Sequence, residues 1–159
     1  MPLISLWNSN PTAVAEFTIE QIVATAGDGI LRNGSICSEE LLLYLAQIQS
    51  SKLATYVSQC LSKKLEKGGM ILQDLINELG RRLDYNVKNG LYQGIVNAIG
   101  YDGIWLSPEG GAIIVEVKTT DAYRISLDTI ANYRERLISA GAISGTPSIL
   151  IVVRTPGYR

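Results

Sequence analysis

Histidine is absent from this chain of 159 residues. Its absence excludes Ser-His-Asp and Cys-His catalysis, zinc sites rich in histidine, and nucleases that use a histidine as general base. Cys37 and Cys60 are the two cysteines, too few to form a structural zinc site alone. Carboxylates therefore remain as the candidate metal ligands, and these favour Mg²⁺, Mn²⁺ or Ca²⁺.

The sequence also lacks a long hydrophobic run, a secretion signal and an excess of positive charge. No apolar stretch approaches the roughly 20 residues of a membrane span, and the first residues have neither a basic region nor a cleavage site. We therefore expect a cytoplasmic protein with no membrane partner, in which both thiols are reduced and buried. The net charge of −1 and the pI of about 5.5 argue against a strong nonspecific grip on nucleic acid, so any such contact must be local or shared with a partner.

What is present is enough apolar sequence for one compact domain, since 47% of the residues are hydrophobic. Residues 1–69 are expected to form a helical N-terminal region that packs on a core formed by residues 70–159. Within the first region, residues 1–37 indicate a short helix plus loops, and Ser38 is expected to cap a helix with apolar residues at helical spacing. Apolar residues continue to recur at helical spacing as far as Gly80, where the glycine is expected to end the last of these helices.

Beyond that glycine the apolar period changes to alternation, which is typical of strands. The last strand is a continuous apolar run, as expected for a strand buried on both faces. The order strand, helix, strand indicates a right-handed crossover, so the predicted fold class is α/β, a mixed sheet flanked by helices. The expected elements are strands at residues 83–89, 101–106, 112–118 and 148–154, with the second and third joined as a hairpin, and a helix from Ser126 to Gly141.

The strand at residues 112–118 carries charge on one face. Glu116 and Lys118 share that face, because alternate side chains of a strand point the same way. If the hairpin closes symmetrically, Asp102 lies opposite Glu116, with Cβ atoms roughly 4.5 to 5.5 Å apart. Two carboxylates at that distance repel unless a raised pKa or a divalent cation neutralises them, and Lys118 offsets only one. A Glu-Lys pair alone would indicate an exposed strand face, but the facing Asp102 favours a site.

Asp102, followed after thirteen residues by Glu116-Val117-Lys118, resembles the motif of the PD-(D/E)XK nuclease superfamily, the fold of many restriction enzymes and DNA-repair nucleases. The resemblance covers about residues 70–154 and includes the order of the surrounding elements. It implies a restriction endonuclease-like core in which Asp102, Glu116 and the backbone carbonyl of Val117 bind one or two Mg²⁺ or Mn²⁺ ions. Lys118 would position the attacking water or help to deprotonate it.

Many members of this superfamily add an acid from the helix before the sheet. Glu78 lies at the edge of the apolar arc of that helix and is the candidate, with a solvated residue near a helix end as an equal alternative. Related nucleases often carry a Gln and a Tyr four residues apart in the later helix. The matching positions here are Thr129 and Tyr133, so the Gln is missing.

The resemblance implies a Mg²⁺-dependent endonuclease acting on DNA, in restriction, phage defence or repair. The alternative is a nuclease-like DNA-binding or assembly module that has lost catalysis; the intact triad argues against it, and the acidic pI argues mildly for it. A homodimer would supply the two active sites needed to cut both strands of a duplex. The last apolar strand lies close to the end of the sequence, which indicates a longer parent protein with a further C-terminal domain or a partner subunit.

Overall fold

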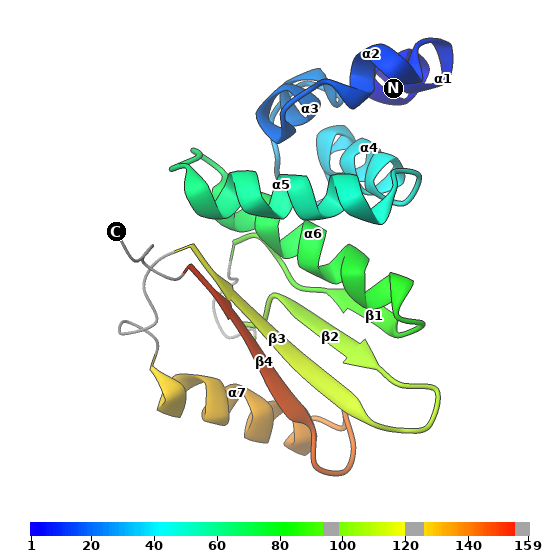
Figure 1. The fold of residues 1–159 in the computed structure, drawn as a ribbon. Helices are drawn as coiled ribbons and strands as arrows, with labels where there is room; N and C mark the ends of the chain where they lie inside the picture. Colours follow the sequence, from blue (N-terminus) through cyan, green and yellow to red (C-terminus); the bar gives the residue numbers. More distant parts are fainter. Residues whose placement is uncertain (94–98, 120–125, 155–159) are drawn as a thin grey trace. The chain divides into compact units, whose positions relative to one another are not determined.

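The computed structural model describes residues 1–93, 99–119 and 126–154 (Figure 1). In this part of the chain, seven helices accompany one four-stranded mixed sheet, so the fold is mixed α/β, as predicted. The chain forms two compact units, Met1–Glu78 and Leu79–Arg159. None of the helices in the described ranges is long and apolar enough to cross a membrane.

The first unit is helical. Its N-terminal part contains three short helices, so the predicted single short helix with loops was wrong. Each helix has its own start signal: α1 and α2 carry proline at their beginning, and Thr18 and Gln21 form a capping box for α3. The next helix begins earlier than predicted, because Ser35 rather than Ser38 caps it and accepts the Ser38 N–H at 3.1 Å. The helices are α1 (Pro2–Ser9), α2 (Pro11–Ala15), α3 (Ile19–Thr25), α4 (Ile36–Leu45), α5 (Ser50–Ser62) and α6 (Gly68–Arg82), whose last residues belong to the second unit.

The second unit contains the sheet. Its strands are β1 (Asn86–Asn89), β2 (Gly103–Leu106), β3 (Ala112–Lys118) and β4 (Ser148–Val153), in the order β1-β2-β3-β4. The first three strands are antiparallel, and β4 runs parallel to β3 after the intervening α7 (Leu127–Ser139). The predicted hairpin register is confirmed, since Leu106 pairs with Ala112. The predicted cap of α7 is also confirmed, because Ser126 Oγ accepts the Thr129 N–H.

The predicted end of α6 at Gly80 was wrong. The helix continues to Arg82, and Gly80 is needed for close packing, since a Cβ there would lie 2.5 Å from the Trp105 ring. Asp84, two residues beyond the helix, terminates it with φ +63°. The N–H groups of Asp84 and Tyr85 donate to the carbonyls of Arg81 and Gly80, respectively. These two bonds form a Schellman motif, and so the first strand begins at Asn86 rather than at residue 83.

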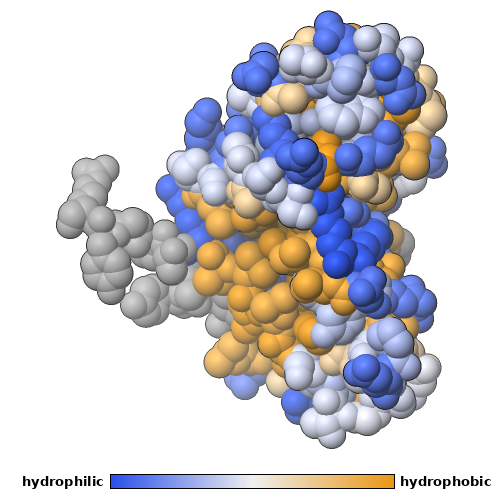
Figure 2. Space-filling view, turned by 45° about the vertical axis from the view of Figure 1, so that its right-hand side comes forward, coloured by the Kyte–Doolittle hydropathy of each residue, from blue (hydrophilic) through white to orange (hydrophobic). Residues whose placement is uncertain are grey.

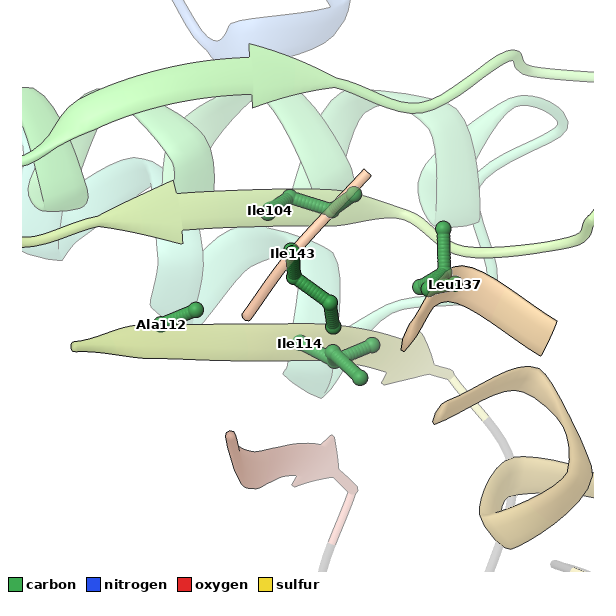
Figure 3. Packing of buried hydrophobic residues seen from close by; sticks show 5 residues of the cluster. All are labelled: Ile104, Ala112, Ile114, Leu137 and Ile143. Carbon is green, nitrogen blue, oxygen red and sulfur yellow. The ribbon is translucent and has the colours of Figure 1, made fainter. Parts of the chain in front are cut away.

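One face of the sheet forms a small hydrophobic core with α7 and the segment after it (Figure 3). Ile104 of β2 and Ala112 and Ile114 of β3 contribute from the sheet, Leu137 contributes from α7, and Ile143 from the following loop. Because Glu116 and Lys118 follow Ile114 at alternate positions, they share this face of β3. The packing of α7 on Ile114 therefore fixes the helix next to the charged end of the strand.

The apolar strand β4 is not buried on both faces, which corrects the prediction. It lies at an edge of the described sheet, and its five apolar residues, 149–153, are half-buried. Exposed apolar side chains also occur near the end of α6, at Leu79 and Leu83. A broad hydrophobic area is visible on the surface in Figure 2. The continuous apolar run thus predicted the strand correctly, but the prediction that both of its faces are buried was wrong.

Candidate functional site

An open cleft of about 450 Å³ in the second unit brings Asp102, Glu116 and Lys118 together. Asp102 directly precedes β2, whereas Glu116 and Lys118 belong to the last part of β3. Tyr133 and Leu137, one turn apart on α7, line the cleft as well. The hairpin and α7 together therefore form the site, because the core beneath them holds the strand and the helix side by side.

Backbone hydrogen bonds fix Asp102 from two sides. Its N–H donates to the Val115 carbonyl at 3.0 Å, and its own carbonyl accepts the Gly90 N–H at 3.0 Å. The carboxylate then reaches β3, where Oδ2 accepts the Val117 N–H at 2.6 Å. A hydrogen bond from a backbone N–H to an ionised carboxylate is stronger than one between neutral groups. The position of the carboxylate is thus set by the sheet itself.

Glu116 and Lys118 form an ion pair in the cleft. The distance from Lys118 Nζ to Glu116 Oε1 is 2.5 Å, and Glu116 is only 7% exposed. Burial works against the positive charge of Lys118, but the hydrogen bond to Glu116 and the charges of Glu116 and Asp102 outweigh it and raise the pKa of the ammonium. Lys118 is therefore protonated near neutral pH.

The environment of Asp102 disfavours the charged form of its carboxyl group. Burial raises the pKa of its carboxyl, and the negative charge of Glu116 raises it further, against the opposing effects of the Val117 N–H and of Lys118. The cleft thus holds two carboxylates, those of Asp102 and Glu116, together with one lysine. A cation bound between them would favour the ionised form of Asp102.

The donor atoms fit a small hard cation. Val115 and Val117 are two residues apart in β3, and both use their backbone groups toward Asp102, so the Val117 carbonyl is directed to the same side of the strand. Asp102, Glu116 and this carbonyl would supply oxygen ligands, which Mg²⁺ prefers. No third Asp, Glu or cysteine joins the two acids within the described ranges. Water or phosphate oxygens would complete the ligand set, as is usual for Mg²⁺.

The other predicted residues lie elsewhere or have other contacts. Glu78 is buried on α6 and belongs to the first unit, so its assignment to the site remains a prediction. Thr129 is bound at the start of α7, where its N–H and hydroxyl both contact Ser126 Oγ. Residues 120–125, which follow β3 and its motif residues, lie outside the described part of the chain.

Several residues of the site were not identified from the sequence. Gly90 directly follows the expected first strand, and a Cβ on it would lie 1.9 Å from the Tyr101 carbonyl oxygen, so it permits the backbone to approach the residue before Asp102. Tyr101 also lines the cleft, and its place directly before Asp102 was the available signal. These contacts join segments far apart in the sequence, where no local pattern predicts them.

No protein-family model, curated protein or solved structure matches this chain.

Proposed function

We propose that this protein is a metal-dependent nuclease that hydrolyses phosphodiester bonds of DNA, with Asp102 and Glu116 as metal ligands and Lys118 beside them. The observation that carries the proposal is the meeting of these three charged groups in one open cleft, with Asp102 bound to the backbone of the very strand that bears the other two. A carboxylate pair can hold the metal ion for hydrolysis of a phosphodiester, and an adjacent lysine adds a fixed positive charge beside it.

The arrangement of elements supports a restriction endonuclease-like fold as part of this proposal. The antiparallel hairpin β2–β3 carries the charged residues, and α7 leads to β4, which is parallel to β3. This is the order that the PD-(D/E)XK resemblance implies. The proposal of a common fold thus rests on element order and on the positions of the motif residues.

Each residue has a distinct part in the proposed chemistry. Asp102, Glu116 and the Val117 carbonyl would hold Mg²⁺ or Mn²⁺, which lowers the pKa of water and neutralises charge on the scissile phosphate. Lys118 would orient the attacking water or help to deprotonate it, and its ammonium form would stabilise negative charge on the phosphate. The Val117 N–H keeps the Asp102 carboxylate in position.

The proposal is tested by cleavage of supercoiled plasmid and of single-stranded DNA with Mg²⁺ or Mn²⁺. Asp102→Asn, Glu116→Gln and Lys118→Met keep the size of each side chain and remove its charge. Each is expected to lower the cleavage rate by more than about 100-fold. Calorimetry should show binding of Mn²⁺ to the native protein and its loss in the two acid variants.

Glu109→Gln and Lys88→Met are the matched controls. Glu109 lies in the exposed turn of the same hairpin, and Lys88 is exposed on β1, so these changes remove one negative and one positive charge from the second unit outside the cleft lining. They should leave cleavage and metal binding unchanged. Absence of metal binding and of cleavage in the native protein would contradict the proposal and favour a nuclease-like binding module. Cleavage that survives in Glu116→Gln would assign any nuclease activity to another site.

A further inference from the structure

Uncharged side chains form most of the wall of the cleft that holds Asp102, Glu116 and Lys118. Three of them are aromatic and three are aliphatic, and all belong to the second unit. The cleft therefore joins a charged end, suited to a phosphate, to an apolar and aromatic surface. These uncharged residues are Tyr92, Tyr101 and Tyr133, together with Leu91, Ile99 and Leu137.

The cleft offers little to the backbone of a duplex. Among its described lining residues Lys118 is the one cation, and its ammonium already contacts Glu116 Oε1. Proteins that bind duplex DNA rely on many Lys and Arg contacts to phosphates, each of which releases counterions. The chain as a whole has a net charge of −1, so a strong duplex affinity has no general electrostatic source either.

The tyrosines lie close to the charged groups. Tyr101 directly precedes Asp102 and packs against the core of the unit, which holds it in place. Tyr133 lines the cleft together with Lys118, and its ring lies against Gly100, where an added Cβ would be 3.2 Å from the hydroxyl oxygen. Gly100 thus leaves room for the ring in the cleft wall. Aromatic side chains stack on the faces of unpaired bases, which a duplex does not expose.

We propose that this cleft binds an unpaired nucleotide of single-stranded DNA, with the base against the tyrosine-lined wall and the adjoining phosphate at Asp102, Glu116 and Lys118. The inference rests on the proposed nuclease function and names its substrate class. The cleft volume of about 450 Å³ lies within the range of about 300 to 1,000 Å³ that is typical of small-ligand sites. It suits one nucleotide rather than a segment of duplex.

The test compares one fluorescently labelled oligonucleotide as a single strand and as a perfect duplex. Fluorescence anisotropy gives both affinities in the Glu116→Gln background, where cleavage does not interfere, and cleavage rates come from the native chain with Mg²⁺. The single strand should bind at least about tenfold more tightly and be cut preferentially. Tyr133→Leu, which removes the ring, should weaken single-strand binding by about tenfold, the lower part of the range for loss of one stacked base. Tyr133→Phe keeps the ring and should retain more of the affinity than Tyr133→Leu.

The outcomes separate this inference from the nuclease proposal. Duplex binding as tight as single-strand binding, or binding of neither form, overturns the inference, whatever the cleavage assay shows. An equal effect of Tyr133→Leu on both forms also overturns it, provided that circular dichroism shows a folded protein. Tyrosine-dependent binding of the single strand without metal-dependent cleavage supports the nucleotide site but overturns the nuclease proposal.

Discussion

Gly90 lies where no side chain fits. Its N–H donates to the Asp102 carbonyl at 3.0 Å, and a Cβ would lie 1.9 Å from the Tyr101 carbonyl oxygen. Gly90→Ala should therefore displace the segment that carries Asp102. We expect metal affinity and cleavage to fall by about 10- to 100-fold, as for other groups that orient a metal ligand. Manganese titration by calorimetry measures the first effect and the plasmid assay the second.

Gly69→Ala is the control for this change. Gly69 lies in helix α6 with nothing within 4 Å of an added Cβ, so alanine should leave the site unchanged. If Gly90→Ala bound metal as tightly as the native chain, the backbone contact at Gly90 would have no part in positioning Asp102.

Glu40 has a structural role in the first unit. The side chain is fully buried, and its two carboxylate oxygens accept the N–H groups of Ile4, at 2.8 Å, and Gly27, at 2.6 Å. Glu40→Ala leaves both donors without this partner in the interior, at a cost on the order of 3 kcal/mol in the free energy of unfolding. Urea denaturation measures that cost, and amide hydrogen exchange should show faster opening of α1. Glu39→Ala, an exposed neighbour on the same helix, should change stability by less than about 0.5 kcal/mol; a similar loss in both variants would contradict the role of Glu40.

At the residue scale the sequence could predict which charged residues meet in the candidate site, but not the backbone contacts that hold them in position. Alternation along the strand places Glu116 and Lys118 on one face, and the turn between the strands places Asp102 beside them. The bond from Val117 to Asp102 and the approach of Gly90 to Tyr101 depend on tertiary contacts. The two acceptor bonds of Glu40 are of the same kind, since they connect α4 to segments 36 and 13 residues away.

Among the elements, the end of α6 gives a direct test of backbone conformation. Asp84 has φ +63° and an exposed side chain, so its identity matters mainly through the backbone. Glycine adopts this conformation without the steric cost that a Cβ imposes. Asp84→Gly should therefore be more stable than Asp84→Ala by about 1 kcal/mol, as measured by urea denaturation of both variants.

The same two substitutions at Glu135 provide the control. Glu135 is exposed in the interior of α7, where alanine favours the helix and glycine disfavours it by about 1 kcal/mol. The order of stability should thus reverse between the two positions. An identical order at both sites would mean that the left-handed backbone at Asp84 does not determine the effect.

The elements that the sequence predicted well have strong signals at both ends. The strand β3 lies between a glycine-rich turn and its charged end, and α7 begins at Ser126 and is followed by Gly141. The boundary between α6 and β1 was wrong because Leu83 and Tyr85 alternate as in a strand, although Leu83 still belongs to the helix end. Burial of β4 was overestimated because an apolar run does not reveal whether a strand has one neighbour or two.

At the scale of the whole molecule, both cysteines lie in the first unit. Chemical labelling of the thiols therefore measures the opening of this unit separately from that of the second unit. Cys37 and Cys60 are free and buried, with 0% and 1% exposure. Burial, assisted by nearby acids, raises the pKa of Cys37 from 9.0 to about 11 and that of Cys60 from 9.0 to about 12. At pH 8 the native thiols are therefore protonated as well as inaccessible, and they should react with Ellman's reagent only when the first unit opens. Ser58→Cys, which places a thiol on the exposed side of α5, should react at once and serves as the control.

The same shifts predict how stability depends on pH. Below pH 9 the thiols are protonated in both states, so their contribution to the stability of the first unit is fully present. As the pH rises past 9 the unfolded chain loses these protons first, and the contribution is lost by the time the pH passes about 11 for Cys37 and about 12 for Cys60. The urea midpoint of thiol labelling should therefore fall between pH 8 and pH 10, and the fall should be smaller in Cys37→Ala and Cys60→Ala. A midpoint that stays constant over this range, or a fall in both variants as large as in the native chain, would show that the buried thiols do not link the folding of this unit to pH.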